Sequence, residues 1–177
     1  AIGGGSVIDC AKVVAAGACY DGDPWDLVIT PRWIKKALPI YSVLTLSATG
    51  SEMDPFAVIS DMSKNEKWGT ASEHMKPKMS ILDPEYTYSV SKKQTAAGTA
   101  DMISHICENY FTNVKNADVQ ARFAEGLLKN CFKYGPIALE EPDNYDARAN
   151  LMWTASMAIN GILSDGAEVS LIQSRYI

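Results

Sequence analysis

The stretch Gly3-Gly4-Gly5-Ser6-Val7-Ile8-Asp9-Cys10-Ala11-Lys12 follows the apolar pair Ala1-Ile2 at the start of the chain. The pair has the character of a strand end, and the three glycines predict a tight turn. Beyond the turn, apolar residues recur at the spacing of one helical face, at Val7, Ile8, Ala11, Val14 and Ala15. Gly17 and the cluster Asp21-Gly22-Asp23-Pro24 predict the end of this helix. A strand, a glycine turn and a helix in this order indicate an α/β fold.

The glycine-rich turn is also a candidate anion site. Glycine lets a backbone approach a phosphate closely, and the unpaired N–H groups of a helix start favour negative charge. The alternative is a tight turn without a ligand, since the pattern is neither GxGxxG nor a P-loop. Asp9 and Lys12 fall on the first turns of the helix, where we expect a solvated capping carboxylate and a surface charge.

The next strand candidate is the apolar, β-branched run from Ile40 to Leu46, which is typical of a strand buried between helices. It leads into the polar loop Ser47-Ala48-Thr49-Gly50-Ser51-Glu52. Open α/β sheets bind ligands at the ends of their strands, and Thr45, Thr49 and Ser51 could there bond a phosphate or a ribose. The alternative is that these hydroxyls only satisfy the loop backbone.

The rest of this half contains short elements and turns. Phe56-Ala57-Val58-Ile59-Ser60 is followed by the turn-rich stretch Ser63-Lys64-Asn65-Glu66-Lys67, and Met79 to Leu82 is a further strand candidate. A lysine in a turn, such as Lys67, is usually only solvated. Asp83-Pro84 closes the β-containing half.

Helices dominate from Ser91, which predicts a capping box with Gln94. Gly98 predicts a break between a first helix and a second one over residues 99–112. A third helix is expected from about Asn116 to Gly135-Pro136, and a fourth over residues 145–163. On one side of the third helix we expect the apolar residues Val119, Phe123, Ala124, Leu127, Leu128, Cys131 and Phe132. The chain thus divides into an α/β part, residues 1–90, and an all-helical part, residues 91–177.

Asp101 and His105 form half of a metal site in the second predicted helix. Residues at i and i+4 share a helical face, with β-carbons about 5–6 Å apart. Catalytic transition-metal sites use about three or four protein ligands, and the other histidine, His74, lies in a different segment. The alternative is a surface ion pair or a core histidine. The small, uncharged stretch 96–100 favours a partly desolvated ligand pair.

Composition excludes several classes of protein. The net charge of −5, without a cluster of Lys or Arg, argues against a surface for nucleic acid or anionic membranes. No stretch is long and apolar enough to predict a membrane span or a leader. The cysteines, which contain no CxxC pair, are expected as free thiols: Cys10, Cys19, Cys107 and Cys131. A cytoplasmic protein is the resulting expectation.

Several stretches in the same chain resemble the iron-dependent (group III) alcohol dehydrogenases, and in particular the butanol dehydrogenase-like branch that reduces aldehydes. They are GGGSVIDCAK from residue 3, LTLSATGSE from residue 44, SILDPEYTYS from residue 80, AAGTADMISHICENYF from residue 96, RFAEGLLKN from residue 122 and EEPDNYDARANLMWTASMAINGIL from residue 140. The resemblance runs almost continuously to about Val169. Motifs in a fixed order are far more specific than one glycine turn.

The resemblance implies roles for particular residues. It implies NAD(P) as the cofactor, with contacts from Gly4, Gly5, Ser6, Thr45, Thr49 and Lys67. Asp101 and His105 match the first two ligands of the catalytic metal, Fe²⁺ or in some members Zn²⁺. No residue of the chain is assigned as a catalytic acid or base. The substrate would be a small aldehyde or alcohol, and the full-length form a homodimer or higher oligomer.

The resemblance also implies that both domains are incomplete. The expected fold is α/β, with part of a Rossmann-like nucleotide-binding domain followed by part of an all-helical metal-binding domain. The first strands, the position that selects NAD or NADP, and two further metal-binding histidines are expected outside this chain. Residues 170–177 no longer resemble the family.

The predicted function is part of an enzyme that reduces aldehydes by hydride transfer from NAD(P)H. One alternative is a catalytically inactive remnant that acts as a nucleotide-binding or dimerisation module. A second alternative is the reaction of a glycerol dehydrogenase or a dehydroquinate synthase, which share the architecture. The motif agreement favours the alcohol dehydrogenase branch over this second alternative.

Overall fold

Residues 1–112 and 114–164 are described by the computed structural model, and their contacts divide into two units. The α/β unit comprises Ala1–Val43 and Ser51–Ile81. The helical unit comprises Leu44–Gly50 and the described residues from Leu82 onward. The mixed α/β class expected from the sequence is confirmed, whereas the domain division at residue 90 stays a prediction.

The α/β unit contains a small sheet whose strands come from its beginning, middle and end. It contains β1 (Ile2–Gly3), β2 (Tyr41–Leu44) and β5 (Met79–Ile81) in the order β1-β2-β5. β2 and β5 are parallel, with Tyr41 opposite Met79 and Val43 opposite Ile81. The strands predicted near residues 40 and 79 are therefore confirmed, although β2 ends earlier than the apolar run does.

A hairpin of β3 (Phe56–Asp61) and β4 (Glu66–Ala71) completes the strands described in this unit. The prediction that Lys67 lies in a turn is wrong, because Lys67 lies in β4 opposite Ser60. Asn65 has a φ of 53°, a left-handed conformation that asparagine tolerates, so the chain reverses before Glu66 and not after Lys67.

The helix predicted after the glycine turn is α1 (Gly5–Gly17), but its buried face differs from the expected one. Val7 and Val14 are exposed. The buried residues of α1 are Gly5, Ile8, Asp9, Lys12, Ala15 and Ala16. Asp9 and Lys12 are therefore not solvated, and that expectation is wrong.

Shorter helices complete the α/β unit. The short helix α2 (Pro24–Ile29) was not predicted, and it begins where the Asp23 carboxylate accepts a hydrogen bond from the Trp25 N–H at 2.9 Å. The 3-10 turns η1 (Pro31–Trp33) and η2 (Glu73–Met75) follow. Around α1 and α2 the core contains Ala15, Ala16, Leu27, Ile34, Ile40 and Met75.

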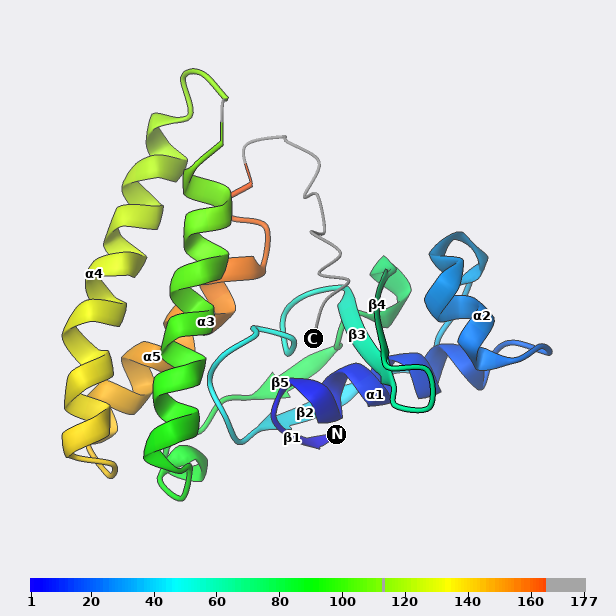
Figure 1. Ribbon diagram of the computed structural model, residues 1–177, viewed down its shortest axis with the longest axis horizontal. Coiled ribbons are helices and arrows are strands. Elements are labelled where there is room, and N and C mark those ends of the chain that lie inside the picture. The colour runs from blue at the N-terminus through cyan, green and yellow to red at the C-terminus, as the bar shows by residue number, and fades with distance from the viewer. Residues whose placement is uncertain (113, 165–177) are drawn as a thin grey trace. The chain divides into compact units, whose positions relative to one another are not determined.

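The helical unit contains α3 (Lys92–Tyr110), α4 (Asp118–Glu140) and α5 (Tyr145–Ile159), preceded by the 3-10 turn η3 (Pro84–Thr87). α3 and α4 lie side by side, and the chain passes from one to the other at a shared end (Figure 1). Ser91 Oγ accepts the Gln94 N–H at 3.3 Å, as the predicted cap requires. The core between these helices contains Met102, Ile106, Ala124, Cys131, Ala138, Ala147, Leu151, Ala155, Ala158 and Leu163.

Two predicted helix ends are wrong. α3 continues through Gly98, because this glycine serves close packing: a Cβ there would lie 2.5 Å from Ser47 O. α4 continues through Gly135-Pro136 to Glu140, with Gly135 packed against Thr99. Tertiary contacts, with a loop at Gly98 and with a neighbouring helix at Gly135, thus override the local helix-breaking tendency of glycine and proline.

The surface of α4 also differs from the expectation. Of the residues predicted on one side, Ala124 and Cys131 are buried, whereas the exposed ones are Val119, Phe123 and Phe132. None of the described helices combines the length and the apolar character that a membrane span requires.

Residues 170–177, which are expected from the sequence to lie outside the resemblance, lie outside the described part of the chain.

Candidate nucleotide and metal sites

The start of α1 has the properties of an anion site. Its N-cap residue is Gly4, in an extended conformation, and Gly4 O accepts the N–H groups of Val7 and Ile8 at 3.1 and 3.2 Å. Within the described residues, no side chain caps this end and no acidic residue occupies the first turn. The first-turn N–H groups, at Gly5 and Ser6, are therefore not satisfied by a side-chain cap, which is the condition for an anion site at a helix start.

Gly3 has a steric role in the same turn. A Cβ at this position would lie 2.7 Å from Val7 Cβ, closer than real Cβ contacts allow. The turn therefore packs directly onto the first turn of α1, which only a residue without a side chain permits.

Lys67 belongs to the same unit as the glycine turn. It is exposed on β4, and its charge is one of those that lower the pKa of Asp9 on α1. Burial is the largest effect on that carboxyl and raises its pKa overall. The charge of Lys67 therefore acts, as one of the smaller effects, on a carboxyl of α1.

The sequence reading missed the buried charges of α1. Lys12 is fully buried, and its Nζ lies 2.7 Å from Asp54 Oδ1. Burial raises the pKa of Asp54 to about 6, despite the opposing attraction of Lys12. The available signal was helical phase, because Lys12 is four residues after Ile8 and three before Ala15, in the middle of the apolar stripe.

Thr45 and Thr49 lie in the loop Leu44–Gly50, which belongs to the helical unit. Two glycines hold this loop against the helices. Gly50 has a φ of +69°, and a Cβ there would lie 2.7 Å from Ala155 O on α5. Gly98 on α3 faces Ser47 O in the same way. The loop is therefore packed between α3 and α5, and both threonines are partly exposed.

A pocket of about 320 Å³ opens between this loop and α3. It is lined by Leu46, Ala48, Gln94, Ala97, Gly98 and Asp101. The small residues predicted to allow close packing, in the stretch 96–100, thus include part of its wall. Asp101 is the charged residue of this wall.

Asp101 and His105 project together from α3. Asp101 Oδ1 lies 3.8 Å from His105 Nε2, and their side chains are 39% and 19% exposed. Two ligands that each bind a metal at about 2.1 Å stand roughly 3–3.5 Å apart, so a small rotation brings this pair to that separation. In the described part of the chain, His105 Nδ1 is buried without a hydrogen-bond partner.

This half-site fits a divalent metal in donor type and direction but not in number. No group of three or more His, Cys, Asp or Glu residues that could hold a metal occurs in residues 1–112 and 114–164. His74 belongs to the α/β unit, in η2. A carboxylate and an imidazole suit iron or zinc, and further ligands would be required.

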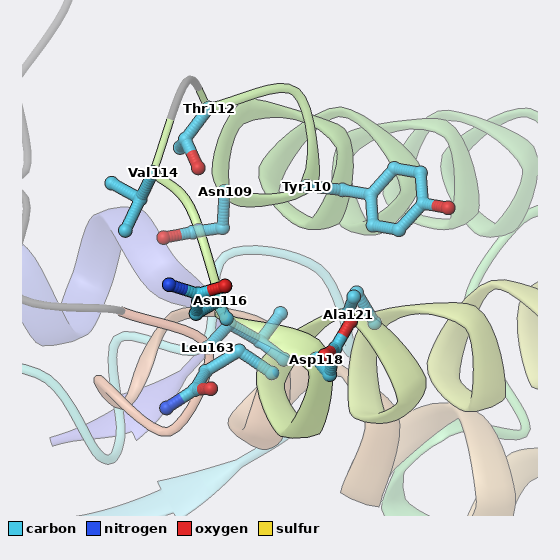
Figure 2. Close-up of a pocket in the computed structure, with 11 residues that line it drawn as sticks. Asn109, Tyr110, Thr112, Val114, Asn116, Asp118, Ala121 and Leu163 are labelled. Carbon is cyan, nitrogen blue, oxygen red and sulfur yellow. The ribbon is translucent and has the colours of Figure 1, made fainter.

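Another pocket, of about 160 Å³, lies at the end of α3 away from its N-terminus (Figure 2). Its wall includes Asn109, Thr112, Asn116 and Leu163. It contains none of the residues predicted from the sequence to bind the nucleotide or the metal. Nothing in its lining points to a particular ligand.

The predicted residues therefore fall into two groups. Gly4, Gly5, Ser6 and Lys67 belong to the α/β unit. Thr45, Thr49, Asp101 and His105 belong to the helical unit. Each group has a chemistry of its own. The first has the N–H groups of a helix start and a cation, and the second has hydroxyls and a metal-ligand pair beside a pocket.

Comparison with known proteins gives matches over nearly the whole chain. The family model for iron-containing alcohol dehydrogenase matches residues 1–84, and the C-terminal model of the Fe-containing alcohol dehydrogenase family matches residues 95–171. The second match thus includes the first two residues of the stretch 170–177. From the sequence alone, the resemblance is expected to end before residue 170, so this match extends two residues beyond the expected end.

Individual relatives agree with these matches. NADH-dependent butanol dehydrogenase A of Clostridium acetobutylicum is 61% identical over 95% of this chain and 43% of its own length. The NADPH-dependent aldehyde reductase YqhD of Escherichia coli is 46% identical over 94% of this chain and 44% of its own length. The chain therefore spans less than half the length of these relatives.

The fold agrees as well. The crystal structure of NADH-dependent butanol dehydrogenase A from Thermotoga maritima superposes with a TM-score of 0.88 at 48% identity. The alignment covers 92% of this chain and 40% of that structure.

Proposed function

Because the chain belongs to the iron-containing alcohol dehydrogenase family, we propose that it supplies nucleotide- and metal-binding parts of an NAD(P)-dependent enzyme that reduces aldehydes to alcohols. The observation that carries this proposal is the Asp101 and His105 pair, with Asp101 in the wall of the pocket beside the loop Leu44–Gly50. The relatives named for NADH- or NADPH-dependent reactions of butanol and aldehydes support the substrate class.

Asp101 and His105 would hold the metal, Fe²⁺ or Zn²⁺. A bound divalent metal supplies Lewis-acid chemistry, which stabilises negative charge that develops on a carbonyl oxygen. The carboxylate of Asp101 contributes negative charge, and the imidazole of His105 contributes a neutral nitrogen donor. Leu46, Ala48 and Ala97 give the pocket beside Asp101 apolar walls, against which the carbon chain of a small aldehyde would pack.

The nucleotide would be bound by the two groups of residues described above. The first-turn N–H groups of Gly5 and Ser6 bind the pyrophosphate, and Lys67 adds a positive charge. The hydroxyls of Thr45 and Thr49 bond the nucleotide at the end of β2. A bound reduced nicotinamide would supply the hydride for the carbonyl carbon, and these residues would hold and orient the nucleotide.

Metal binding by the purified chain tests the proposed ligands. Asp101→Asn and His105→Ala are each expected to weaken Zn²⁺ binding in calorimetry by at least about tenfold, since each removes one of two first ligands. His74→Ala is the matched control, because it removes the other histidine of the chain without touching α3. Equal loss in all three variants would contradict a specific site.

A second candidate function is nucleotide binding without turnover. It is favoured because no group of three or more His, Cys, Asp or Glu residues that could hold a metal occurs in the described residues. The discriminating assay is NADH oxidation by butyraldehyde with added Fe²⁺ or Zn²⁺. Turnover that His105→Ala abolishes would support the dehydrogenase, whereas NADH binding without turnover would support the binding module.

A further inference from the structure

Lys12 is the centre of a buried polar cluster in the α/β unit. Its side chain has no exposed surface, and its ammonium group has well-placed acceptors. Lys12 Nζ donates to Ser51 Oγ at 2.9 Å, to Asp54 Oδ1 at 2.7 Å and to Phe56 O at 2.7 Å. An ammonium group has three donors, so these bonds account for its full capacity.

Asp9, one turn earlier on α1, extends the cluster. Ser51 Oγ donates to Asp9 Oδ1 at 2.5 Å, and the Val58 N–H donates to Asp9 Oδ2 at 2.9 Å. The Phe56 N–H donates to Asp54 Oδ1 at 2.8 Å. We refer to Asp9, Lys12, Ser51 and Asp54 as the α1 cluster. It joins α1 directly to β3 and to the segment that leads into it.

Stability alone is a weak reason for such a cluster. Burying two carboxylates and one ammonium group carries a large desolvation cost, and apolar residues of similar volume often do as well or better. A hydrogen-bonded cluster differs from apolar packing in that it fixes direction, because each bond has a required angle and partner. The function of the α1 cluster is therefore to be sought in what it orients.

The α1 cluster lies on the helix whose first turn is the glycine-rich anion site. Asp9 and Lys12 are four and seven residues after Gly5, or about 6 and 10 Å along the helix axis, too far to touch a phosphate there. β3, to which the cluster binds α1, pairs with β4 and places Lys67 opposite Ser60. The cluster thus connects both groups of the α/β unit that are proposed to contact the nucleotide.

We propose that the α1 cluster is a positioning device for nucleotide binding, with Lys12 and Asp54 as positioning residues that hold the first turn of α1 and Lys67 at a fixed spacing. This inference rests on the proposed function. A purely structural cluster would affect unfolding, whereas a positioning cluster affects the affinity for NADH while the protein stays folded.

The test compares NADH affinity by fluorescence titration at a temperature where circular dichroism shows each variant folded. Lys12→Met is expected to raise the dissociation constant for NADH at least tenfold. Leu27→Ala is the matched control, because it removes a buried side chain from the core around α1 and lies outside both the cluster and the glycine turn, and it should stay within twofold of the original chain. A loss in Lys12→Met no larger than in Leu27→Ala would overturn the proposal.

A double variant separates the effect of the cluster on NADH affinity from its effect on the stability of the fold. Lys12→Met combined with Asp54→Leu removes both members of the buried ion pair and leaves Asp9 with its bonds from Ser51 and Val58. The midpoint of thermal unfolding should therefore recover toward that of the original chain while NADH affinity stays low. Recovery of both would overturn the proposal. If Lys12→Met fails to fold, Ser51→Ala replaces it, since it removes only the hydroxyl that links Asp9 to Lys12, and the same tenfold weakening is expected.

Hydrogen exchange measured without NADH tests the α1 cluster even if the proposed function fails. If the original chain does not bind NADH, the proposed function fails. Hydrogen exchange of the Val7 and Ile8 amides, which donate to Gly4 O, then still tests the cluster. Faster exchange there in Ser51→Ala than in Leu27→Ala supports the positioning role, and equal exchange contradicts it.

Discussion

Lys12 illustrates how one buried charge can depend on its partners. The ammonium group is acceptable in the interior because Ser51, Asp54 and the carbonyl of Phe56 surround it. Removal of one partner leaves the remaining charge buried without compensation. The Asp54 carboxylate is almost fully buried, so it is the group that loses most when Lys12 is removed.

The first prediction concerns Lys12→Met. We expect the free energy of unfolding of the chain to fall by about 3 kcal/mol, since breaking a buried ion pair by removing one partner costs roughly 3–5 kcal/mol. Urea unfolding at pH 7 measures the change. Lys64→Met is the control, because its ion pair with Asp61 is exposed and should contribute less than about 1 kcal/mol. Similar losses in the two variants would argue against a buried pair in solution.

The second prediction concerns pH. Burial raises the pKa of Asp54 from 3.8 to about 6, so the folded chain binds this proton more tightly than the unfolded chain. The contribution of Asp54 to the free energy of unfolding therefore falls as pH rises from about 4 to about 6, by at most about 3 kcal/mol, and is constant above that range. The raised pKa of Asp9 acts with the same sign.

Urea unfolding between pH 4 and pH 7 checks this expectation, with Asp54→Asn as the comparison. The difference between the two pH profiles isolates Asp54, because all other carboxyls are shared. The profile of Asp54→Asn should fall less steeply between pH 4 and pH 6. Parallel profiles would show that the carboxyl titrates at its ordinary pKa in solution.

Sequence alone could predict only some of the residues that matter in the two candidate sites and in the α1 cluster. The glycine turn and the Asp101 and His105 spacing are local patterns, and local patterns can be read directly. The burial of Asp9 and Lys12 depends on Ser51, Asp54 and Phe56, some forty residues further along the chain. A rule that assigns charged residues to the surface fails where distant partners satisfy them.

At the scale of elements, Gly98 shows why a helix-breaking residue can lie inside a helix. α3 passes through Gly98, and the space that a side chain would occupy is filled by Ser47 O and Ala48 Cβ. The missing side chain thus lets the loop Leu44–Gly50 approach α3. The loop and α3 together form the pocket beside Asp101.

The third prediction uses two glycines in helices as a matched pair. Gly126→Ala in α4 is expected to raise the free energy of unfolding by up to about 1 kcal/mol, because nothing lies within 4 Å of the added Cβ and alanine favours helix. Gly98→Ala gains the same helix preference but places its Cβ 2.5 Å from Ser47 O. We expect a net loss of about 1–2 kcal/mol there from overpacking.

Urea unfolding of both variants measures these changes, and NADH titration of Gly98→Ala adds a functional readout. Displacement of the loop should weaken NADH binding in Gly98→Ala and leave it unchanged in Gly126→Ala. Stabilisation by both substitutions would show that the loop does not pack against α3 in solution.

Element boundaries were predictable where local signals and packing agree. Gly17 at the end of α1 and the Ser91 cap of α3 are such cases. The prediction failed where contacts between helices carry the chain past a breaking signal, as at Gly135-Pro136 in α4. The sequence does not predict β4 because its residues other than Trp68 are polar or small, without the alternation that identifies a strand.

At the scale of the whole molecule, the proposed nucleotide contacts belong to both units. Gly4, Gly5, Ser6 and Lys67 lie in the α/β unit, and Thr45 and Thr49 lie in the helical unit. The proposed metal ligands, by contrast, lie within the helical unit alone. NADH and the metal should therefore protect different segments of the chain. A bound molecule protects the segments that it contacts, and it shifts the folding equilibrium by mass action.

The fourth prediction follows from this division. Hydrogen exchange of the purified chain with saturating NADH should slow at residues 4–8 and at residues 45–49, while Zn²⁺ alone should slow exchange around residues 98–106 of α3. At a ligand concentration of 100 times the dissociation constant, the stabilisation is about 2.7 kcal/mol, or nearly a hundredfold in the exchange of amides that open only by unfolding.

The controls for this experiment come from the proposed contacts themselves. His105→Ala should abolish the protection by Zn²⁺ and leave the protection by NADH at residues 4–8 intact. Lys67→Met should weaken the protection by NADH, whereas Lys64→Met, an exposed lysine in the same hairpin, should not. If NADH protected only the α/β unit, Thr45 and Thr49 would not be nucleotide contacts in this chain. The α/β unit would then suffice for nucleotide binding, and the helical unit would retain only the metal half-site.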